Sequence, residues 1–276
     1  MKTRYTADNV RYRTMTTSEL AGSFLISGLF GENEIVLEYC EIERAVVGSA
    51  VPVKGPLKLE AGKELAADYF CQRREVGVLN IGEAGKVTVD GAGYDMERLD
   101  CLYIGRGAKD ILFESADASS PAKFYILSYP AHADFPTTHA KKADAEPVNL
   151  GSEKEANKRT IYKLIHPDGI KSCQLVMGFT VLEEGSVWNT MPAHTHERRT
   201  EVYMYFDVAD GAIVLHLMGP ADETRHIVVH DSDAVVSPMW SIHSGVGTGS
   251  YTFCWGMGGE NQAFDDMDHI SIDDLK

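Results

Sequence analysis

The chain has 276 residues, a hydrophobic fraction of 44% and a formal net charge of −15. That length is enough for one large domain or two of ordinary size. The excess of acidic residues argues against nonspecific binding to nucleic acid or to an anionic membrane, because both need clustered lysines and arginines. An acidic substrate would need a local cationic pocket inside this acidic shell.

The N-terminal sequence and the cysteines predict a cytoplasmic protein. Residues 1–15 have no apolar core of a signal peptide. No apolar run approaches the ~20 residues of a membrane-spanning helix. The five cysteines are odd in number and show no CxxC spacing, which is typical of reduced thiols in a cytosolic protein.

In chain order, one helix is followed by many short strands. Residues 16–25, "TTSELAGSFL", form the best helix candidate, with Ser or Thr as the N-cap. The later segments are β-branched or aromatic and are bounded by Gly, Asp or Pro, so they predict an all-β barrel or sandwich. The predicted strands are 34–42, 76–82, 85–91, 101–105, 123–130, 172–185, 201–208, 212–219, 226–230, 234–238 and 251–258.

A faint internal repeat predicts two copies of one β-barrel unit. "CQRREVGVLNI" from Cys71 aligns with "HERRTEVYMYF" from His196, and two later strand pairs align in the same order. The segment between the copies is rich in Pro, Ala and charge and has no strand period, which is typical of a connection. The predicted organisation is an N-terminal domain (1–140), a linker (141–160) and a C-terminal domain (161–276).

The two copies differ in their polar residues. Tyr69 and Cys71 stand where the second copy has His194 and His196, and Asp110 stands opposite His243. Only one polar residue matches, Glu75 against Glu201. The first copy therefore lacks the histidines, and any function that depends on them belongs to the second copy.

The histidines of the second copy predict a metal site. His194 and His196 are two residues apart, so in a strand they project from the same face. The polar insert "ERRT" predicts a bend that brings Glu201 beside them, and His243 follows a later strand. Three imidazoles and a carboxylate suit Zn²⁺, Fe²⁺, Mn²⁺, Ni²⁺ or Co²⁺ rather than Ca²⁺ or Mg²⁺. Zn²⁺ is the first choice, at one divalent ion per chain.

These residues resemble two nested families. "HTHERRTE" with a later His resembles the metal motif of the cupin superfamily, so a tandem pair implies a bicupin of double-stranded β-helix (jelly-roll) barrels. Across nearly the whole chain, "WNTMPAHTHERRTEVYMYF", "ETRHIVVH", "SPMWSIHSGVGT" and "ENQAFDDMDH" are similar to the 4-deoxy-L-threo-5-hexosulose-uronate ketol-isomerase (5-keto-4-deoxyuronate isomerase) family.

The resemblance implies a function in pectin and uronate breakdown. His194, His196, Glu201 and His243 become zinc ligands of a cytoplasmic bicupin that assembles as a hexamer. The implied reaction converts 5-dehydro-4-deoxy-D-glucuronate to 3-deoxy-D-glycero-2,5-hexodiulosonate, an aldose–ketose isomerisation. The partner is a small acidic sugar, with neither nucleic acid nor membrane.

The sequence gives several candidates for substrate contacts but no catalytic base. Arginine holds carboxylates bidentately, so a uronate carboxylate calls for a cation. As a ligand, Glu201 is a poor candidate for a free base. Two alternatives remain open, a cupin dioxygenase with the same ligands and a non-catalytic sugar-acid binder. The candidate substrate contacts are Arg159, Lys163, Arg198, Arg199, Tyr203 and Gln262.

Overall fold

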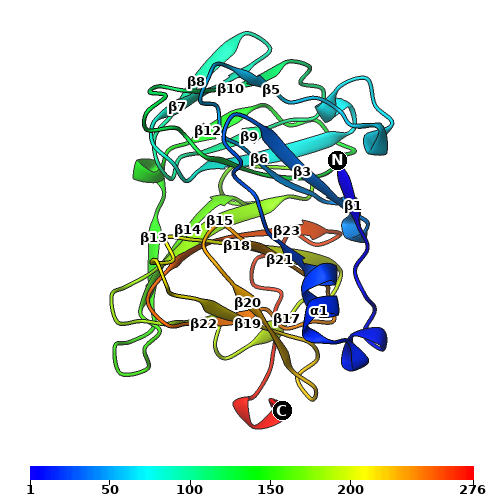
Figure 1. Cartoon of the computed structure of the whole chain (residues 1–276), viewed down its shortest axis with the longest axis vertical. Helices are drawn as coiled ribbons and strands as arrows, with labels where there is room; N and C mark the ends of the chain where they lie inside the picture. Colours follow the sequence, from blue (N-terminus) through cyan, green and yellow to red (C-terminus); the bar gives the residue numbers. More distant parts are fainter. The chain divides into compact units, whose positions relative to one another are not determined.

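Strands form most of the chain, and the computed structural model, which describes all 276 residues, divides it into two units (Figure 1). Each unit pairs a seven-stranded sheet with a four-stranded sheet. The first unit comprises residues 1–4, 28–145 and 164–176, and the second comprises residues 5–27, 146–163 and 177–276.

The first unit is a β-barrel closed around an apolar core. Val76 and Val78 from the large sheet meet Phe113 and Phe124 in that core. In order across the large sheet, the strands are β1 (Lys2–Arg4), β3 (Ile35–Cys40), β4 (Val46–Ala50), β11 (Phe124–Pro130), β6 (Arg74–Asn80), β9 (Cys101–Ile104) and β12 (Thr138–Ala140). The small sheet contains β5 (Leu57–Lys58), β10 (Ile111–Ser115), β7 (Gly85–Val89) and β8 (Ala92–Met96).

The second unit repeats this arrangement. Its large sheet contains β13 (Pro147–Leu150), β14 (Arg159–Ile165), β15 (Val176–Leu182), β23 (Thr252–Gly259), β18 (Arg199–Phe206), β21 (Ala234–Ser237) and β2 (Leu25–Ile26). Its small sheet contains β16 (Trp188–Asn189), β22 (Ser244–Gly247), β19 (Val214–Met218) and β20 (Arg225–Val229). A separate two-stranded ladder joins β17 (His194–Thr195) to β24 (Asp268–His269).

Matching strand orders confirm the internal repeat. The run β3-β4-β11-β6-β9 in the first unit corresponds to β14-β15-β23-β18-β21 in the second, and β5-β10-β7-β8 corresponds to β16-β22-β19-β20. Every strand expected from the sequence is present. The tandem cupin expectation for the fold class is therefore confirmed.

The boundaries between the units differ from the expected ones. The expected helix is present as α1 (Thr17–Phe24), capped by a reciprocal Thr16–Glu19 capping box, but it belongs to the second unit. The expected linker, 141–160, contains β13 and the start of β14. The edge strand β13 was not predicted because all four of its residues are exposed, so it shows no alternation of apolar and polar residues. Pro and charged residues are typical of such edge strands.

Residues 164–176 belong to the first unit, and Glu75 explains why. Its carboxylate accepts hydrogen bonds from the backbone N–H groups of Cys173, Gln174 and Leu175, at 2.7–2.8 Å. The hydroxyl of Tyr103 donates a further hydrogen bond of 2.7 Å. Glu75 is fully buried, so these four donors replace the water that its charge loses.

The structure corrects the alignment of Glu75 with Glu201. Val76 and Val78 face the core of the first barrel, so Glu75 points to the opposite face of β6. Val76 pairs with Ile104, the last residue of β9, just as Glu201 pairs with Ser237, the last residue of β21. Val76 is thus the counterpart of Glu201, and Arg74 is the counterpart of Arg199.

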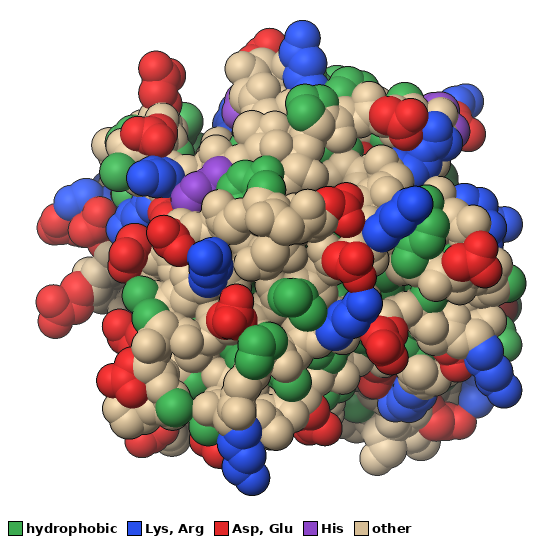
Figure 2. Space-filling view, turned by 90° about the horizontal axis from the view of Figure 1, so that it is seen from above, with side chains coloured by type: hydrophobic (Ala, Val, Ile, Leu, Met, Phe, Trp, Pro, Cys, Tyr) green, Lys and Arg blue, Asp and Glu red, His purple; other side chains and the backbone are tan.

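The structure also bears on the expected reduced thiols and on the expected absence of a membrane-spanning helix. All five cysteines are free thiols, and four of them are buried. No helix combines the length and the apolar character that crossing a bilayer would take. Figure 2 shows one face of the molecule, on which acidic and basic side chains are interspersed.

Candidate metal centre and active site

Three short elements of the second barrel bring four predicted ligands together. His194 lies on β17 and His196 just after it, Glu201 lies on β18, and His243 immediately precedes β22. Arg198, between the histidines and Glu201, has a φ of 67°, which makes the predicted bend. His196, Glu201 and His243 are buried, while His194 is half-buried. The chain thus turns four polar side chains toward one point at the mouth of the barrel.

The distances within this cluster suit a metal ion. Nε2 of His194 lies 3.2 Å from Nε2 of His196 and 3.0 Å from Nε2 of His243. The Glu201 Oε2 atom lies 3.0 Å from the His196 Nε2 atom and 2.9 Å from the His243 Nε2 atom. All four donor atoms fall within 4.8 Å of one another. Neutral imidazoles cannot satisfy three converging nitrogens with one another, whereas a divalent cation accepts a lone pair from each.

The electrostatics of the cluster favour the metal-binding forms of His194 and Glu201. Burial, reinforced by the nearby His243, lowers the pKa of His194 to about 2. Burial alone would raise the pKa of Glu201, but His243 and His196 bring it well below its ordinary value. Metal ligands must be deprotonated, so the lowered pKa values of His194 and Glu201 favour cation binding at neutral pH.

A C-terminal segment supports the cluster from outside. The ring nitrogen Nδ1 of His196 lies 3.0 Å from the backbone oxygen of Asp266. The Nη2 atom of Arg199 lies 2.7 Å from the same Nδ1 atom, so this edge of the ring is held from outside while Nε2 faces the other ligands. The buried guanidinium of Arg199 donates to the carbonyls of Ala263 and Asp266, and β24 pairs with β17. Residues 263–269 are therefore tied directly to the strand that carries His194.

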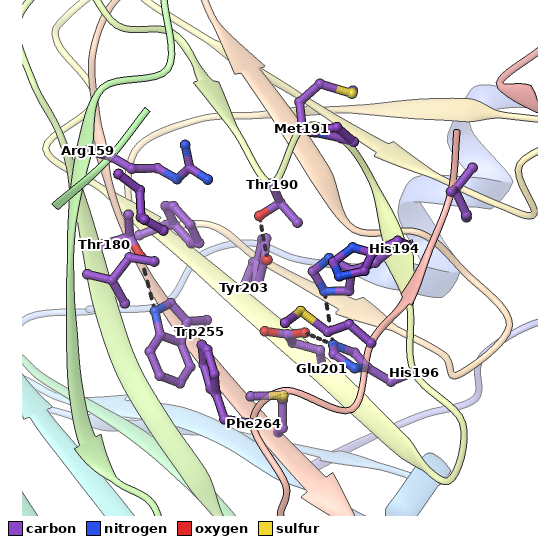
Figure 3. Close-up of a pocket in the computed structure, with 18 of the residues that line it drawn as sticks. Arg159, Thr180, Thr190, Met191, His194, His196, Glu201, Tyr203, Trp255 and Phe264 are labelled. Atoms are coloured by element: carbon purple, nitrogen blue, oxygen red, sulfur yellow. Dashed lines mark hydrogen bonds and ion pairs between the residues drawn. The ribbon is translucent and has the colours of Figure 1, made fainter. Parts of the chain in front are cut away.

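The cluster opens into a cavity of about 620 Å³. In Figure 3 the guanidinium of Arg159 points into this cavity from the side across from His194 and His196. Arg159 makes one hydrogen bond, from Nη1 to the backbone oxygen of Asn157, and burial lowers its pKa. The wall between the two ends is mostly apolar. Its residues include Ile161, Phe253, Trp255, Met257, Phe264, Met267 and Ile270.

Among the candidate substrate contacts, the structure places two in the cavity. Arg159 and Tyr203 line it, and the Tyr203 hydroxyl lies 2.9 Å from Oγ1 of Thr190 (Figure 3). Arg199 is buried but is engaged with backbone carbonyls of residues 263–266 rather than facing the cavity.

The other three candidates lie outside the cavity lining. Arg198 is exposed and forms an ion pair with Glu260, because the bend that positions Glu201 turns it to solvent. The Nζ atom of Lys163 sits 4.0 Å from the centre of the Phe264 ring, so it packs behind the wall. Gln262 is likewise absent from the lining residues.

Sequence reasoning missed the role of the C-terminal tail. The acidic stretch "DDMDHISIDDLK" reads as a solvated end, yet Met267, His269 and Ile270 line the cavity. Their only sequence signal is apolar residues within an acidic tail. His216 was also missed. It is fully buried beneath the site, with its Nδ1 atom 2.8 Å from the Tyr205 hydroxyl and its Nε2 atom 3.3 Å from Oγ of Ser237.

Comparisons with known proteins agree with this architecture. The model of the KduI/IolB family matches residues 30–272. A protein of Lachnoclostridium phytofermentans named 4-deoxy-L-threo-5-hexosulose-uronate ketol-isomerase is 54% identical over 276 residues, which is 100% of both chains.

Two solved structures share the fold at low sequence identity. An IolB-like protein of Salmonella typhimurium has a TM-score of 0.69 at 12% identity, over 90% of this chain and 96% of that one. An oxalate decarboxylase of Bacillus subtilis, whose structure concerns its Mn(II) centres, has a TM-score of 0.57 at 10% identity, over 81% of this chain and 71% of that one. With its whole-length relative, its family match and its two cupin barrels, the chain belongs to the KduI/IolB family.

Proposed function

We propose that this protein is a metal-dependent ketol-isomerase that converts 5-dehydro-4-deoxy-D-glucuronate to 3-deoxy-D-glycero-2,5-hexodiulosonate in uronate catabolism. The isomerase class follows from the whole-length relatives that carry this name. The observation that supports the metal and the acidic substrate is one cavity with a four-ligand cluster at one end and the half-buried Arg159 at the other.

The two ends of the cavity match the two ends of the substrate. The proposed substrate carries its aldehyde at C1 and its carboxylate at C6. Arg159 forms no ion pair within the protein and lies in an apolar wall, where a carboxylate would restore its lost hydration. With the carboxylate on Arg159, the C1 and C2 oxygens extend toward His194, His196, Glu201 and His243.

In an aldose–ketose isomerisation, different residues of the chain would bind the metal, orient the sugar and exclude water. A bound divalent ion, with Zn²⁺ the first choice, would act as a Lewis acid on the C1 and C2 oxygens and make the C2 hydrogen more acidic. The four ligands hold their donors 2.9–3.2 Å apart from their neighbours, ready for such an ion. Tyr203, hydrogen-bonded to Thr190, orients the middle of the sugar. The C-terminal segment covers the site and limits the access of water.

The decisive test follows the substrate in D₂O by NMR with metal-analysed protein. Conversion to the 2,5-diketo acid, lost on chelation and restored by one divalent ion per chain, supports the proposal. Absence of conversion by folded, metal-loaded protein contradicts it. Oxygen consumption under the same conditions would instead indicate a cupin dioxygenase. Binding without turnover would indicate a sugar-acid binder.

The proposal also covers the setting in which the enzyme works. We place it in the cytoplasm as a homo-hexamer acting on a small acidic sugar, without nucleic acid or membrane partners. The acidic net charge of −15 and the free thiols support this setting. Light scattering of the purified protein checks the hexamer.

A further inference from the structure

The first barrel has a cavity of its own, on strands that correspond to those around the active-site cavity of the second. This cavity of about 190 Å³ lies against β3, the start of β6 and the end of β11. Those strands are the counterparts of β14, β18 and β23, which border the active-site cavity. The lining residues differ, because Val76, the counterpart of Glu201, lies in the apolar core and Arg74 corresponds to Arg199, which does not face the active-site cavity.

Three arginines line this cavity. Arg74, the counterpart of Arg199, is only 6% exposed. Its Nε and Nη2 atoms donate to the Ser128 side chain and to the carbonyls of Ser128 and Arg44, and it forms no ion pair. Arg44 and Arg73 complete the set, and Arg73 is fixed by the carbonyls of Leu65 and Ala66.

The charge of Arg74 is not balanced by the protein. Its hydrogen-bond acceptors are all neutral, and burial lowers its pKa to about 10. Glu64 is the one acidic residue in the lining, and its Oε2 atom lies 3.6 Å from the amino group of Met1. Buried charges in proteins are normally paired, so an unpaired guanidinium at a cavity indicates an anion that comes from outside.

We propose that the cavity of the first barrel binds a small organic carboxylate through Arg74, Arg73 and Arg44. The free Nη1 of Arg74 and the exposed guanidinium of Arg44 can each donate charged hydrogen bonds to a carboxylate, and Phe70, Leu65 and Pro130 supply apolar contacts for its carbon atoms. The volume admits a short dicarboxylate or part of a sugar acid. In the second barrel, Nη1 and Nη2 of the equivalent Arg199 both donate to the C-terminal segment. In the first barrel, Nε and Nη2 of Arg74 donate to protein acceptors, and its Nη1 atom is left for a ligand.

Isothermal titration calorimetry of malonate binding to the metal-loaded protein tests the proposal. The reference titration uses chloride at the same ionic strength. Arg44→Ser removes an exposed cation without disturbing the core. Ala67→Trp fills the cavity from a surface loop. Arg159→Ala removes the cation of the active site and serves as the matched control. Circular dichroism verifies the fold of each variant.

The expected result is one malonate site per chain that Arg159→Ala leaves intact. Its affinity falls about tenfold in Arg44→Ser, the loss expected for one charged hydrogen bond, and binding disappears in Ala67→Trp. Absence of malonate binding, or binding unchanged in both cavity variants, overturns the proposal. Binding lost only in Arg159→Ala assigns malonate to the active site and also overturns it. Binding of phosphate but not malonate overturns the carboxylate assignment.

Discussion

The carboxylate of Glu201 lies 2.9 Å from Nε2 of His243, which comes from the turn before β22 on the other sheet of the barrel. The two sheets therefore meet at the candidate metal site, and a metal ion there would link them. A ligand that binds only the folded state stabilises a protein, by an amount that grows with the logarithm of the ligand concentration divided by its dissociation constant. The cluster is thus expected to contribute to stability as well as to catalysis.

His243→Ala is expected to abolish isomerisation and reduce bound metal. Removal of one of four ligands leaves an incomplete coordination sphere, and activity should fall by more than about a hundredfold. Metal analysis and the NMR assay measure the two effects. His226→Ala, an exposed histidine on β20, is the control. Full activity in His243→Ala would contradict the role of the cluster.

Arg159→Ala is expected to lower kcat/KM without loss of metal. A hydrogen bond to a charged group contributes about 1.5–3 kcal/mol, which corresponds to a decrease of about 10- to 150-fold. Steady-state kinetics give the effect, and Arg159→Lys should recover only part of it because lysine lacks the planar fork. Equal kinetics for Arg159→Ala and wild type would show that the substrate carboxylate binds elsewhere.

Arg199→Lys is expected to loosen the C-terminal segment. Lysine has a single nitrogen, so it cannot serve the carbonyls of Ala263, Phe264 and Asp266 together. Limited proteolysis should cut near residues 260–270 faster, and kcat should fall as the cover of the site opens. Arg198→Lys changes the exposed neighbour and should leave both properties unchanged. Equal proteolysis rates in the two variants would refute a holding role for Arg199.

Glu75→Gln is expected to destabilise the first unit while leaving the chemistry intact. The amide replaces one acceptor oxygen by a donor that faces backbone N–H groups. Loss of charged hydrogen bonds should reduce the free energy of unfolding by about 2–4 kcal/mol. Urea denaturation measures this change. A kcat per folded chain below that of wild type would be inconsistent with a purely structural role.

His216 is expected to make the metal-free protein sensitive to acid. Burial lowers its pKa from 6.5 to about 3, so in this range the unfolded chain binds a proton that the folded chain does not. Its contribution to stability is complete above pH 6.5 and is lost as the pH falls toward 3, at up to about 1.4 kcal/mol per pH unit. Unfolding free energies between pH 7 and 4 should fall less steeply in His216→Gln. Parallel curves would contradict this assignment.

The sequence was most informative where a local pattern decides the structure. Alternating apolar residues predicted the strands, and Thr16 with Glu19 marked the helix. The spacing of His194, His196 and Glu201 indicated the ligands, because residues two apart share a strand face. His243 could be added because it follows a later predicted strand and precedes a Gly-rich turn.

The features that the sequence did not reveal depend on long-range packing. The edge strand β13 has no buried face, so it has no alternating pattern. His269 reaches the cavity only because β24 pairs with β17. The alignment of Glu75 with Glu201 was wrong by one position, and in a strand one position exchanges inside for outside.

The corrected alignment allows the two barrels of one chain to be compared residue by residue. Val76 in the first barrel and Glu201 in the second occupy equivalent places on equivalent strands. The same topology therefore folds with an apolar valine or a charged glutamate at this point, so evolution could alter the chemistry of one copy without rebuilding its framework. The duplicated barrel lets one half specialise in turnover while the other remains free to acquire a different ligand.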